Sequence, residues 1–227
     1  MMENLTKKYW SELQPKVLVG IVTYKGKDYC KEEFMKRANE LTYENYEIFI
    51  VKTDEFKGSS KDRITKGYNL ILTKFKGGNY DYLLTLEADI IPPKYIIEAL
   101  QEHHLLVCSA TYFVGFKNDR KPCIFTGRQF RRKIDNIWKN FNDTLKPEKL
   151  NGELVHASGG CGLGCCLIHK DVFKVVERFR HDEAHCDTYF HDDVQKNKMK
   201  TMVDTGIICK HYGTSEDWQE VIAKGDF

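Results

Sequence analysis

The sequence predicts an α/β fold of three layers, in which helices cover both faces of a mainly parallel central sheet. Three short apolar segments predict its first strands: residues 17–24, 47–53 and 81–86. Each is rich in Val, Ile, Leu and aromatic residues, as expected of strands that are buried on both faces. They begin about 30 residues apart, which is the length of a strand–helix–strand unit with parallel strands.

The segments between these strands predict helices. Between the second and third strands, apolar side chains recur along one helical face: Ile64, Tyr68, Ile71, Leu72 and Phe75. Ser59 followed by Asp62 is typical of a capping box at the start of that helix. A shorter stripe over residues 34–41 predicts a second helix. Pro92-Pro93 ends the third strand and opens a helix over residues 95–100.

The second half of the chain is less regular. We expect two strands and two helices there: residues 105–113, 205–210, 170–179 and 192–199. A glycine-rich run, residues 159–164, leads into an apolar segment at residues 165–168. Because there is no internal repeat and no linker-like segment, we predict a single domain over residues 1–227.

Composition limits the classes of function. The chain has 227 residues, a net charge of +2 and 30% charged residues, so nucleic acid is not an expected partner. No segment approaches the ~20 apolar residues of a transmembrane helix, and the start lacks a signal-peptide pattern. Several of the eight cysteines lie in apolar runs, where reduced thiols pack as small hydrophobic groups. We therefore expect a cytoplasmic protein, free or peripheral to a membrane, with reduced cysteines.

The sharpest local motif is Glu87-Ala88-Asp89, at the carboxyl end of the third strand. Residues i and i+2 of an extended chain point to the same side, so both carboxylates can converge on one point. In an open α/β sheet, ligands bind beyond the carboxyl ends of the strands. Two carboxylates there repel each other unless a cation lies between them, and Mg²⁺ or Mn²⁺ bound to a diphosphate meets that need. The alternative interpretation is an ordinary acidic turn.

The usual glycine-rich phosphate-binding motifs are missing from the first strand–helix turn. The first strand runs into Thr23-Tyr24-Lys25-Gly26-Lys27, which matches neither the dinucleotide-binding nor the P-loop pattern. A nucleotide bound by this protein would have its phosphates held by a metal instead.

These residues carry a resemblance to a known family. The run over residues 63–93 resembles the core of family 2-type glycosyltransferases, in which an asparagine-bearing helix and a Tyr-Leu-Leu strand lead into an acid-x-acid triplet followed by proline. Asn69, 18 residues before Glu87, matches the family's helix asparagine. Tyr68 stands where the family usually has arginine, and Glu87 stands in the usual aspartate position.

The resemblance continues downstream and covers residues 16–213. The glycine-rich run resembles the family's acceptor-side segment, and His191-Asp192-Asp193-Val194 is similar to the acidic motif that begins the next helix. Val203-Asp204-Thr205 and Cys209-Lys210-His211 resemble the late strand that ends in a histidine. The implied fold is GT-A-like, with a nucleotide-binding half at about residues 16–110 and an acceptor-side half at about residues 111–213.

The resemblance implies a metal-dependent hexosyltransferase that moves a sugar from a nucleoside-diphosphate sugar, UDP- or GDP-linked, to a hydroxyl of a glycan, lipid or protein. Its cofactor would be Mn²⁺ or Mg²⁺. Residues implied to bind the donor are Thr23, Asp54, Asn69, Glu87 and Asp89. Those implied to bind the metal are Glu87, Asp89 and His211, and the histidine favours Mn²⁺. Asp193 would be the general base that deprotonates the acceptor.

Each implied role has a plainer alternative. Asp192 and Asp193 can serve as helix caps, and Asp187 is a rival acid for the general base. His211 can be a surface histidine at a strand end, and Asn69 can serve only to position a loop. For the whole protein, the alternatives are a nucleotidyltransferase and a catalytically degenerate domain that binds a nucleotide or glycan without turnover.

Two further clusters have weaker patterns. One combines cysteines and histidines that zinc could bind, although buried thiols and loop histidines are the preferred interpretation: Cys161, Cys165, Cys166, His181, His185 and Cys186. The other is a basic stretch near Trp138 that could contact nucleic acid, an anionic acceptor or the donor diphosphate, although such charge runs are usually solvated faces: Arg128, Arg131, Arg132 and Lys133.

Overall fold

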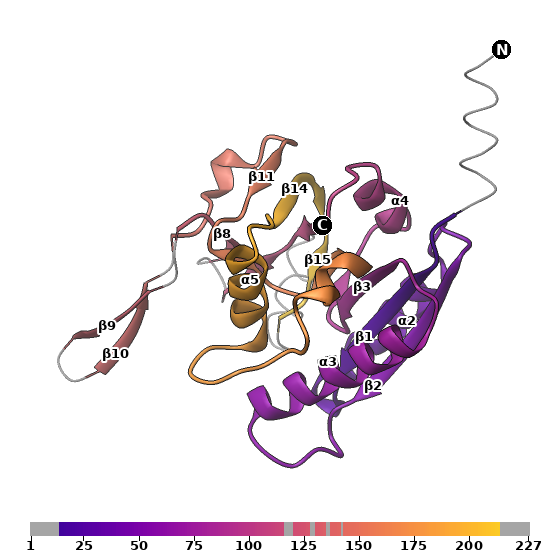
Figure 1. Ribbon diagram of the computed structural model, residues 1–227, viewed down its shortest axis with the longest axis horizontal. Coiled ribbons are helices and arrows are strands. Elements are labelled where there is room, and N and C mark those ends of the chain that lie inside the picture. Colours follow the sequence, from indigo (N-terminus) through magenta and orange to yellow (C-terminus); the bar gives the residue numbers. More distant parts are fainter. Residues whose placement is uncertain (1–13, 116–119, 128–129, 135–136, 142, 214–227) are drawn as a thin grey trace.

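The structure, a computed structural model, describes residues 14–115, 120–127, 130–134, 137–141 and 143–213, with only the backbone of residues 130–134 and 137–141. It confirms the three-layer α/β class (Figure 1). The central sheet has seven strands in the order β11-β14-β5-β13-β3-β1-β2. In chain order these are β1 (Val17–Thr23), β2 (Tyr46–Lys52), β3 (Tyr82–Glu87), β5 (Val107–Thr111), β11 (Leu154–His156), β13 (Cys165–His169) and β14 (Met202–Ile208).

The sheet is mainly parallel. β1 runs parallel to both β2 and β3, and β14 runs parallel to β5. β13 lies between β3 and β5 and is antiparallel to both, so β3 and β5 point the same way. β11 is the other reversed strand, at the sheet edge beside β14. The carboxyl ends of β1, β2 and β3 consequently meet at one edge of the sheet, where the candidate site lies.

Helices cover both faces because β1 alternates its side chains between two cores. Val17, Val19 and Ile21 pack in one core with α2 (Lys31–Asn39) and α4 (Ile96–Gln101). Leu18 and Val22 pack in the other with α3 (Ser60–Gly77) and α5 (Cys186–Lys196). The predicted capping box begins α3, with the Ser59 hydroxyl accepting from the Asp62 backbone and the Asp62 carboxylate accepting from the Ser59 backbone. Three short 3-10 helices complete the helical elements of the described residues: η1 (Lys25–Lys27), η3 (Pro147–Lys149) and η4 (Lys170–Lys174).

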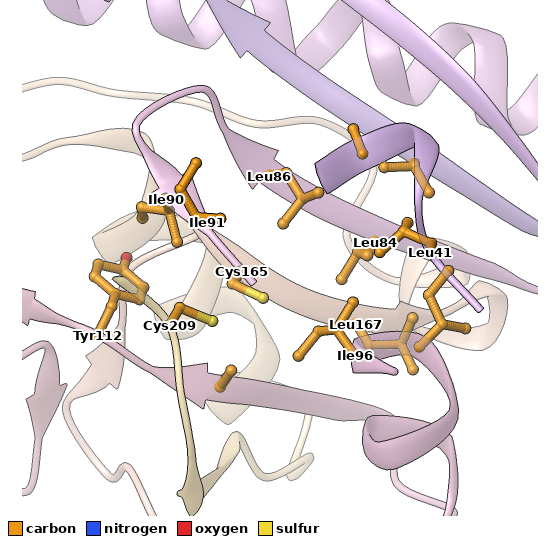
Figure 2. Packing of buried hydrophobic residues seen from close by; sticks show 14 of the residues in the cluster. Leu41, Leu84, Leu86, Ile90, Ile91, Ile96, Tyr112, Cys165, Leu167 and Cys209 are labelled. Atoms are coloured by element: carbon orange, nitrogen blue, oxygen red, sulfur yellow. The ribbon is translucent and has the colours of Figure 1, made fainter. Parts of the chain in front are cut away.

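Apolar packing stabilises the antiparallel strand β13 in the centre of the sheet. Figure 2 shows Cys165 and Leu167 of β13 in the same cluster as Leu84 and Leu86 of β3 and Ile96 of α4. All five side chains are buried. The second half of the chain therefore contributes to the same core as the first.

The second half corrects two expected helices. The helix expected at residues 170–179 is only the 3-10 turn η4, because the chain beyond it is held by side-chain contacts described below. The helix expected at residues 192–199 begins earlier, and α5 spans Cys186–Lys196. Its buried face, Cys186, Phe190 and Val194, repeats every four residues, so this apolar stripe sets the helix start and not the aspartates at 192–193.

Four short ladders lie outside the main sheet. They pair β4 (Ile90–Ile91) with β15 (Lys210–His211), β8 (Ile124–Phe125) with β12 (Gly160–Cys161), β6 (Phe113–Val114) with β7 (Lys121–Pro122), and β9 (Phe130–Ile134) with β10 (Ile137–Phe141). The β9–β10 hairpin extends away from the sheet (Figure 1). The side chains of the basic stretch at residues 128–133 lie outside the described residues. In the described part of the chain, no helix has the length and apolar character that a membrane crossing requires.

Candidate active site

Glu87 and Asp89 lie where the sequence places them, at the carboxyl end of β3. Glu87 is the last residue of β3, and its register partner on β1 is Val22. Asp89 lies in the turn between β3 and β4, with its side chain only 5% exposed. The turn is fixed from the second half of the chain, since the Glu87 amide donates to the Gly164 carbonyl at 3.0 Å and the Tyr212 amide donates to the Asp89 carbonyl at 3.0 Å.

His211 joins this group through the β4–β15 ladder. The ladder pairs His211 with Ile90, the residue after Asp89. As a result, His211 Nε2 lies 3.5 Å from Asp89 Oδ2. Its Nδ1 lies 2.5 Å from the Phe113 carbonyl oxygen and donates to it, which leaves Nε2 as the atom facing the carboxylate. Burial alone would lower the pKa of His211, but the bond to Asp89 and that residue's negative charge outweigh burial and raise it.

Lys27, which the sequence analysis did not select, is the cation between the two carboxylates. Its Nζ lies 2.6 Å from Asp89 Oδ1 and 3.3 Å from Glu87 Oε2. Burial acts to lower the pKa of Lys27, but the charges of Glu87 and Asp89 outweigh it and raise that pKa above its ordinary value. Burial likewise acts to raise the pKa of Asp89, while His211 and Lys27 together hold it below its ordinary value. Lys27 and Asp89 therefore form an ion pair, which Glu87 and His211 flank.

A pocket of about 450 Å³ opens beside this cluster, at the carboxyl ends of β1 and β2. The sequence-predicted Thr23 and Asp54 both line it. Both oxygens of Asp54 accept the backbone N–H of Lys25 at 3.1 Å, which fixes the carboxylate at the pocket wall. The full lining is Thr23, Tyr24, Lys25, Asp28, Lys31, Lys52, Asp54 and Glu55. A pocket with an exposed aromatic ring, carboxylates and lysines can hold a nucleoside and orient its phosphates.

Asn69 is placed differently from the other predicted donor residues. Its Nδ2 donates to the Phe179 carbonyl and its Oδ1 accepts the Phe179 amide, both at 2.9 Å. The amide side chain thus ties α3 to the irregular segment between η4 and α5. This matches the plainer alternative, in which Asn69 positions a loop.

The two candidate bases, Asp187 and Asp193, have different surroundings. Asp193 forms a two-pronged ion pair with Arg180, at 2.7 Å and 3.2 Å. Asp187 lies in the first turn of α5, where it accepts the Thr188 amide at 2.7 Å. Burial raises the pKa of the Asp187 carboxyl, and the negative charge of Glu87 adds to that rise. Asp193 is therefore held in an ion pair, whereas the Asp187 carboxylate is held by the Thr188 amide at the start of α5.

The glycine-rich run packs behind the site. A Cβ on Gly162 would lie 1.8 Å from the Tyr112 hydroxyl oxygen, and one on Gly164 would lie 2.1 Å from Ile90 Cδ1. The glycines therefore let this segment approach Tyr112 and β4 closely, and the approach brings the Gly164 carbonyl to the Glu87 amide. In this fold the run supports the acidic turn.

The cysteines are free and buried, all eight of them. Cys161 Sγ lies 3.5 Å from His191 Nε2, and His191 Nδ1 lies 2.8 Å from the Thr201 hydroxyl. Within the described residues, no three Cys, His, Asp or Glu side chains are placed together to hold a metal, and this applies to Glu87, Asp89 and His211 as well as to the cysteine and histidine cluster. The burial of the thiols agrees with the interpretation of this cluster as buried thiols and loop histidines.

The architecture is GT-A-like. The chain resembles A197 from STIV, with a TM-score of 0.55 and 16% identity over 87% of this chain and 85% of that one. It also resembles the mannosyltransferase PcManGT from Pyrobaculum calidifontis in complex with GDP-Man and Mn²⁺, with a TM-score of 0.53 and 11% identity over 92% of this chain and 63% of that one. A third similar structure is GalNAc-T7 with UDP, GalNAc and Mn²⁺, with a TM-score of 0.56 and 12% identity over 93% of this chain and 48% of that one.

The chain thus spans less than two thirds of each of the last two proteins. At these identities the likeness establishes the fold. No protein-family profile matches the chain, and no curated protein matches it in sequence. The resemblance to family 2-type glycosyltransferases therefore stays a prediction.

Proposed function

We propose that the protein transfers a sugar, most simply a hexose, from a nucleoside-diphosphate sugar to a hydroxyl acceptor. The observation that carries this proposal is the placement of two carboxylates at the end of β3, held by the Lys27 ammonium, beside a 450 Å³ pocket at the ends of β1 and β2. In an open α/β sheet this edge is where ligands bind. The similar structures with GDP-Man or UDP, each with Mn²⁺, support a donor of that chemistry.

The donor would bind with its nucleoside in the pocket and its diphosphate toward the acidic turn. Thr23 and Asp54 would contact the base and ribose, since both line the pocket. Glu87 ends β3 two residues before Asp89, and its carboxylate would accept from a ribose hydroxyl or face the metal. Asn69 is better assigned to positioning, because both of its amide atoms are already bonded to Phe179.

The side chains around Asp89 fit a divalent metal in their chemistry. Two carboxylates and an imidazole are a suitable donor set for Mn²⁺, and Mg²⁺ would use the carboxylates. The His211 Nδ1–H bond to the Phe113 carbonyl is the support that a metal-binding histidine needs, because it directs Nε2 toward the ion. The ammonium of Lys27 lies against the same carboxylates as a stand-in cation. A bound metal would neutralise charge on the departing diphosphate.

For the general base we propose Asp187 in place of Asp193. A base must reach the acceptor hydroxyl and must not be neutralised by a permanent partner. Asp193 is held by Arg180, whereas the Asp187 carboxylate accepts the Thr188 amide and has a pKa raised by burial. The carboxylate of Asp187 would take the acceptor proton as the acceptor oxygen attacks the sugar.

The acceptor and the setting are proposed in broader terms. The acceptor hydroxyl belongs to a glycan, a lipid or a protein. Eight free and buried thiols are in keeping with a reducing compartment, so we propose that the protein works in the cytoplasm, free or at a membrane surface.

Donor binding tests the proposal directly. UDP-, GDP-, dTDP- and CMP-sugars are titrated by calorimetry with and without Mn²⁺, on the wild type and on Asp54→Ala and Asp89→Ala variants. We expect one nucleotide family to bind in a metal-dependent way, and each variant to bind it more weakly. Slow metal-dependent release of the nucleotide from the bound donor then distinguishes a transferase from a degenerate binding domain. If no donor binds in Mn²⁺, the proposed function is wrong.

A further inference from the structure

Lys27 occupies the position at which a metal would contact the acidic turn. Its Nζ is 2.6 Å from Asp89 Oδ1 and 3.3 Å from Glu87 Oε2, and its side chain is only 12% exposed. A metal ion would take the same carboxylate oxygens at about 2.1 Å. The ammonium and a divalent ion cannot both lie against Asp89 Oδ1 at these distances, because the two cations would repel each other strongly.

Hydrogen bonds hold the backbone of Lys27 in place, so its side chain is positioned at the carboxylates. η1 follows β1 directly, and the Lys27 amide donates to the Tyr24 carbonyl at 3.0 Å. Cys30 Sγ lies 3.3 Å from both the Lys27 carbonyl and the Ala88 carbonyl, so one thiol joins η1 to the acidic turn. The Lys27 ammonium also lies 5.8 Å from the centre of the Tyr24 ring, on the side of the nucleotide pocket.

The charges indicate what Lys27 does when ligands arrive. In the free protein the Lys27 ammonium is held by the two carboxylates and is not available to an anionic diphosphate. A divalent ion at the carboxylates reverses this and releases Lys27. The released ammonium would then have a new partner in the diphosphate, which the proposed function places between the acidic turn and the pocket. Lysine binds phosphate as a point charge on a flexible stem, so this move needs only side-chain rotation.

We propose that Lys27 is an exchangeable counter-ion, which holds Glu87 and Asp89 in the free protein, is displaced by the metal and then binds the donor diphosphate. Only the second step, in which Lys27 binds the donor diphosphate, rests on the proposed function. Its consequence is coupling: Lys27 opposes the binding of metal alone and favours the binding of metal and donor together. Removing its charge must therefore change the two affinities in opposite directions.

The test measures both affinities on the full chain. Free Mn²⁺ is titrated by electron paramagnetic resonance, without nucleotide, into the wild type and Lys27→Met. The nucleoside diphosphate UDP or GDP is then titrated by calorimetry at saturating Mn²⁺. For Lys27→Met we expect Mn²⁺ to bind at least about tenfold more tightly and the nucleotide at least about tenfold more weakly, within the usual range of coupling between sites.

Lys74→Met is the matched control. Lys74 Nζ lies 2.7 Å from Glu47 Oε1, so this variant also removes a lysine from a carboxylate, but away from the site. It should leave both affinities unchanged. Circular dichroism checks the fold, and Lys27→Gln, whose amide still donates a hydrogen bond, replaces Lys27→Met if the methionine variant does not fold.

Two outcomes would overturn the proposal. Equal Mn²⁺ affinity in the wild type and in the folded Lys27 variant would show that the lysine does not compete with the metal. Loss of both affinities together would assign Lys27 a purely structural role. If no nucleotide binds to any protein, the proposed function fails, while the titration of Mn²⁺ alone still decides whether Lys27 competes with the metal.

Discussion

Asp187 and Asp193 lie on the same helix, and their different partners predict different effects of mutation. Asp187→Asn should reduce sugar transfer, or donor hydrolysis, by about 10²–10⁴-fold, which is the usual contribution of a general base. The fold and the donor affinity should not change, because asparagine still accepts the Thr188 amide. Nucleotide release at saturating donor measures the effect.

Asp193→Asn is the matched comparison on α5. It removes the charge that pairs with Arg180 and should lower the free energy of unfolding by about 0.5–1 kcal/mol, as for a partly exposed ion pair. Nucleotide release should stay within a few-fold of the wild type. The reverse pattern, with turnover lost in Asp193→Asn and kept in Asp187→Asn, would restore Asp193 as the base.

The raised pKa of Asp187 also predicts a pH dependence of stability. Burial favours the protonated form, so the folded protein binds this proton up to a higher pH than the unfolded chain does. The pKa of Asp187 is about 3.9 in the unfolded chain and higher in the folded protein. The contribution of Asp187 to the free energy of unfolding therefore falls as pH rises between these two pKa values, and it stays low at higher pH.

Asp187→Asn removes that penalty and should raise the melting temperature at neutral pH. Because transfer requires the deprotonated base, turnover in the wild type should fall as pH decreases through the raised pKa. Calorimetric melting of both proteins from pH 4 to 8 checks the first expectation, and a pH–rate profile checks the second. A lower melting temperature for Asp187→Asn at pH 7 would mean that the carboxylate is needed for folding.

At the scale of elements, Asn69 predicts a loss of stability without a loss of binding. Asn69→Ala removes two hydrogen bonds to Phe179 and leaves both backbone groups unsatisfied, at a cost of about 2 kcal/mol. Urea unfolding should show this loss, while donor affinity in Mn²⁺ stays within a few-fold. Leu70→Ala on the solvent-facing side of α3 serves as the neighbouring control, since that side chain is 46% exposed. If Asn69→Ala instead lost most of its donor affinity while the free energy of unfolding changed little, Asn69 would be a donor-binding residue.

The first three strands and α3 could be predicted from the sequence because their signals are local. β1 is an unbroken apolar run, and α3 has both a capping box and an apolar stripe. The sequence also contains a signal for the start of α5, because Cys186, Phe190 and Val194 recur at four-residue spacing. The helix start predicted from the aspartates at 192–193 is wrong, since α5 begins at Cys186. The preference for Asp193 as the base rests instead on the family resemblance, which its spacing to the late strand and His211 suits.

Other parts of the site depend on contacts that no local pattern records. Glu87 and Asp89 could be placed because parallel strands end at a common edge. Lys27 could not, because it reaches Asp89 over 62 residues through a 3-10 turn, and the only signal was a Lys-Gly-Lys sequence after the first strand. His211 reaches Asp89 only through the two-residue ladder of β4 and β15, which the sequence analysis did not anticipate.

At the scale of the whole molecule, the two predicted halves share one sheet. β13 comes from the acceptor-side half, yet it lies between β3 and β5 of the nucleotide-binding half. β14 and β11, also from the second half, extend the sheet beyond β5. The acidic turn is fixed by the same interleaving, through the contacts of Glu87 with Gly164 and of Asp89 with Tyr212. Neither half can therefore lose its structure without exposing the core and the site of the other.

This topology predicts a single unfolding transition, with no folded nucleotide-binding half on its own. Without β13, a fragment of residues 1–111 would leave β3 and β5 unpaired along facing edges and would expose the core that contains Leu84 and Leu86. We expect the calorimetric and van't Hoff enthalpies of the full chain to agree, and the fragment to lack cooperative melting. At about 100 times its dissociation constant, the donor should stabilise the whole chain by about 2.7 kcal/mol and shift the one transition as a unit. Two transitions, of which only one responds to donor, would instead indicate two domains that meet at the site.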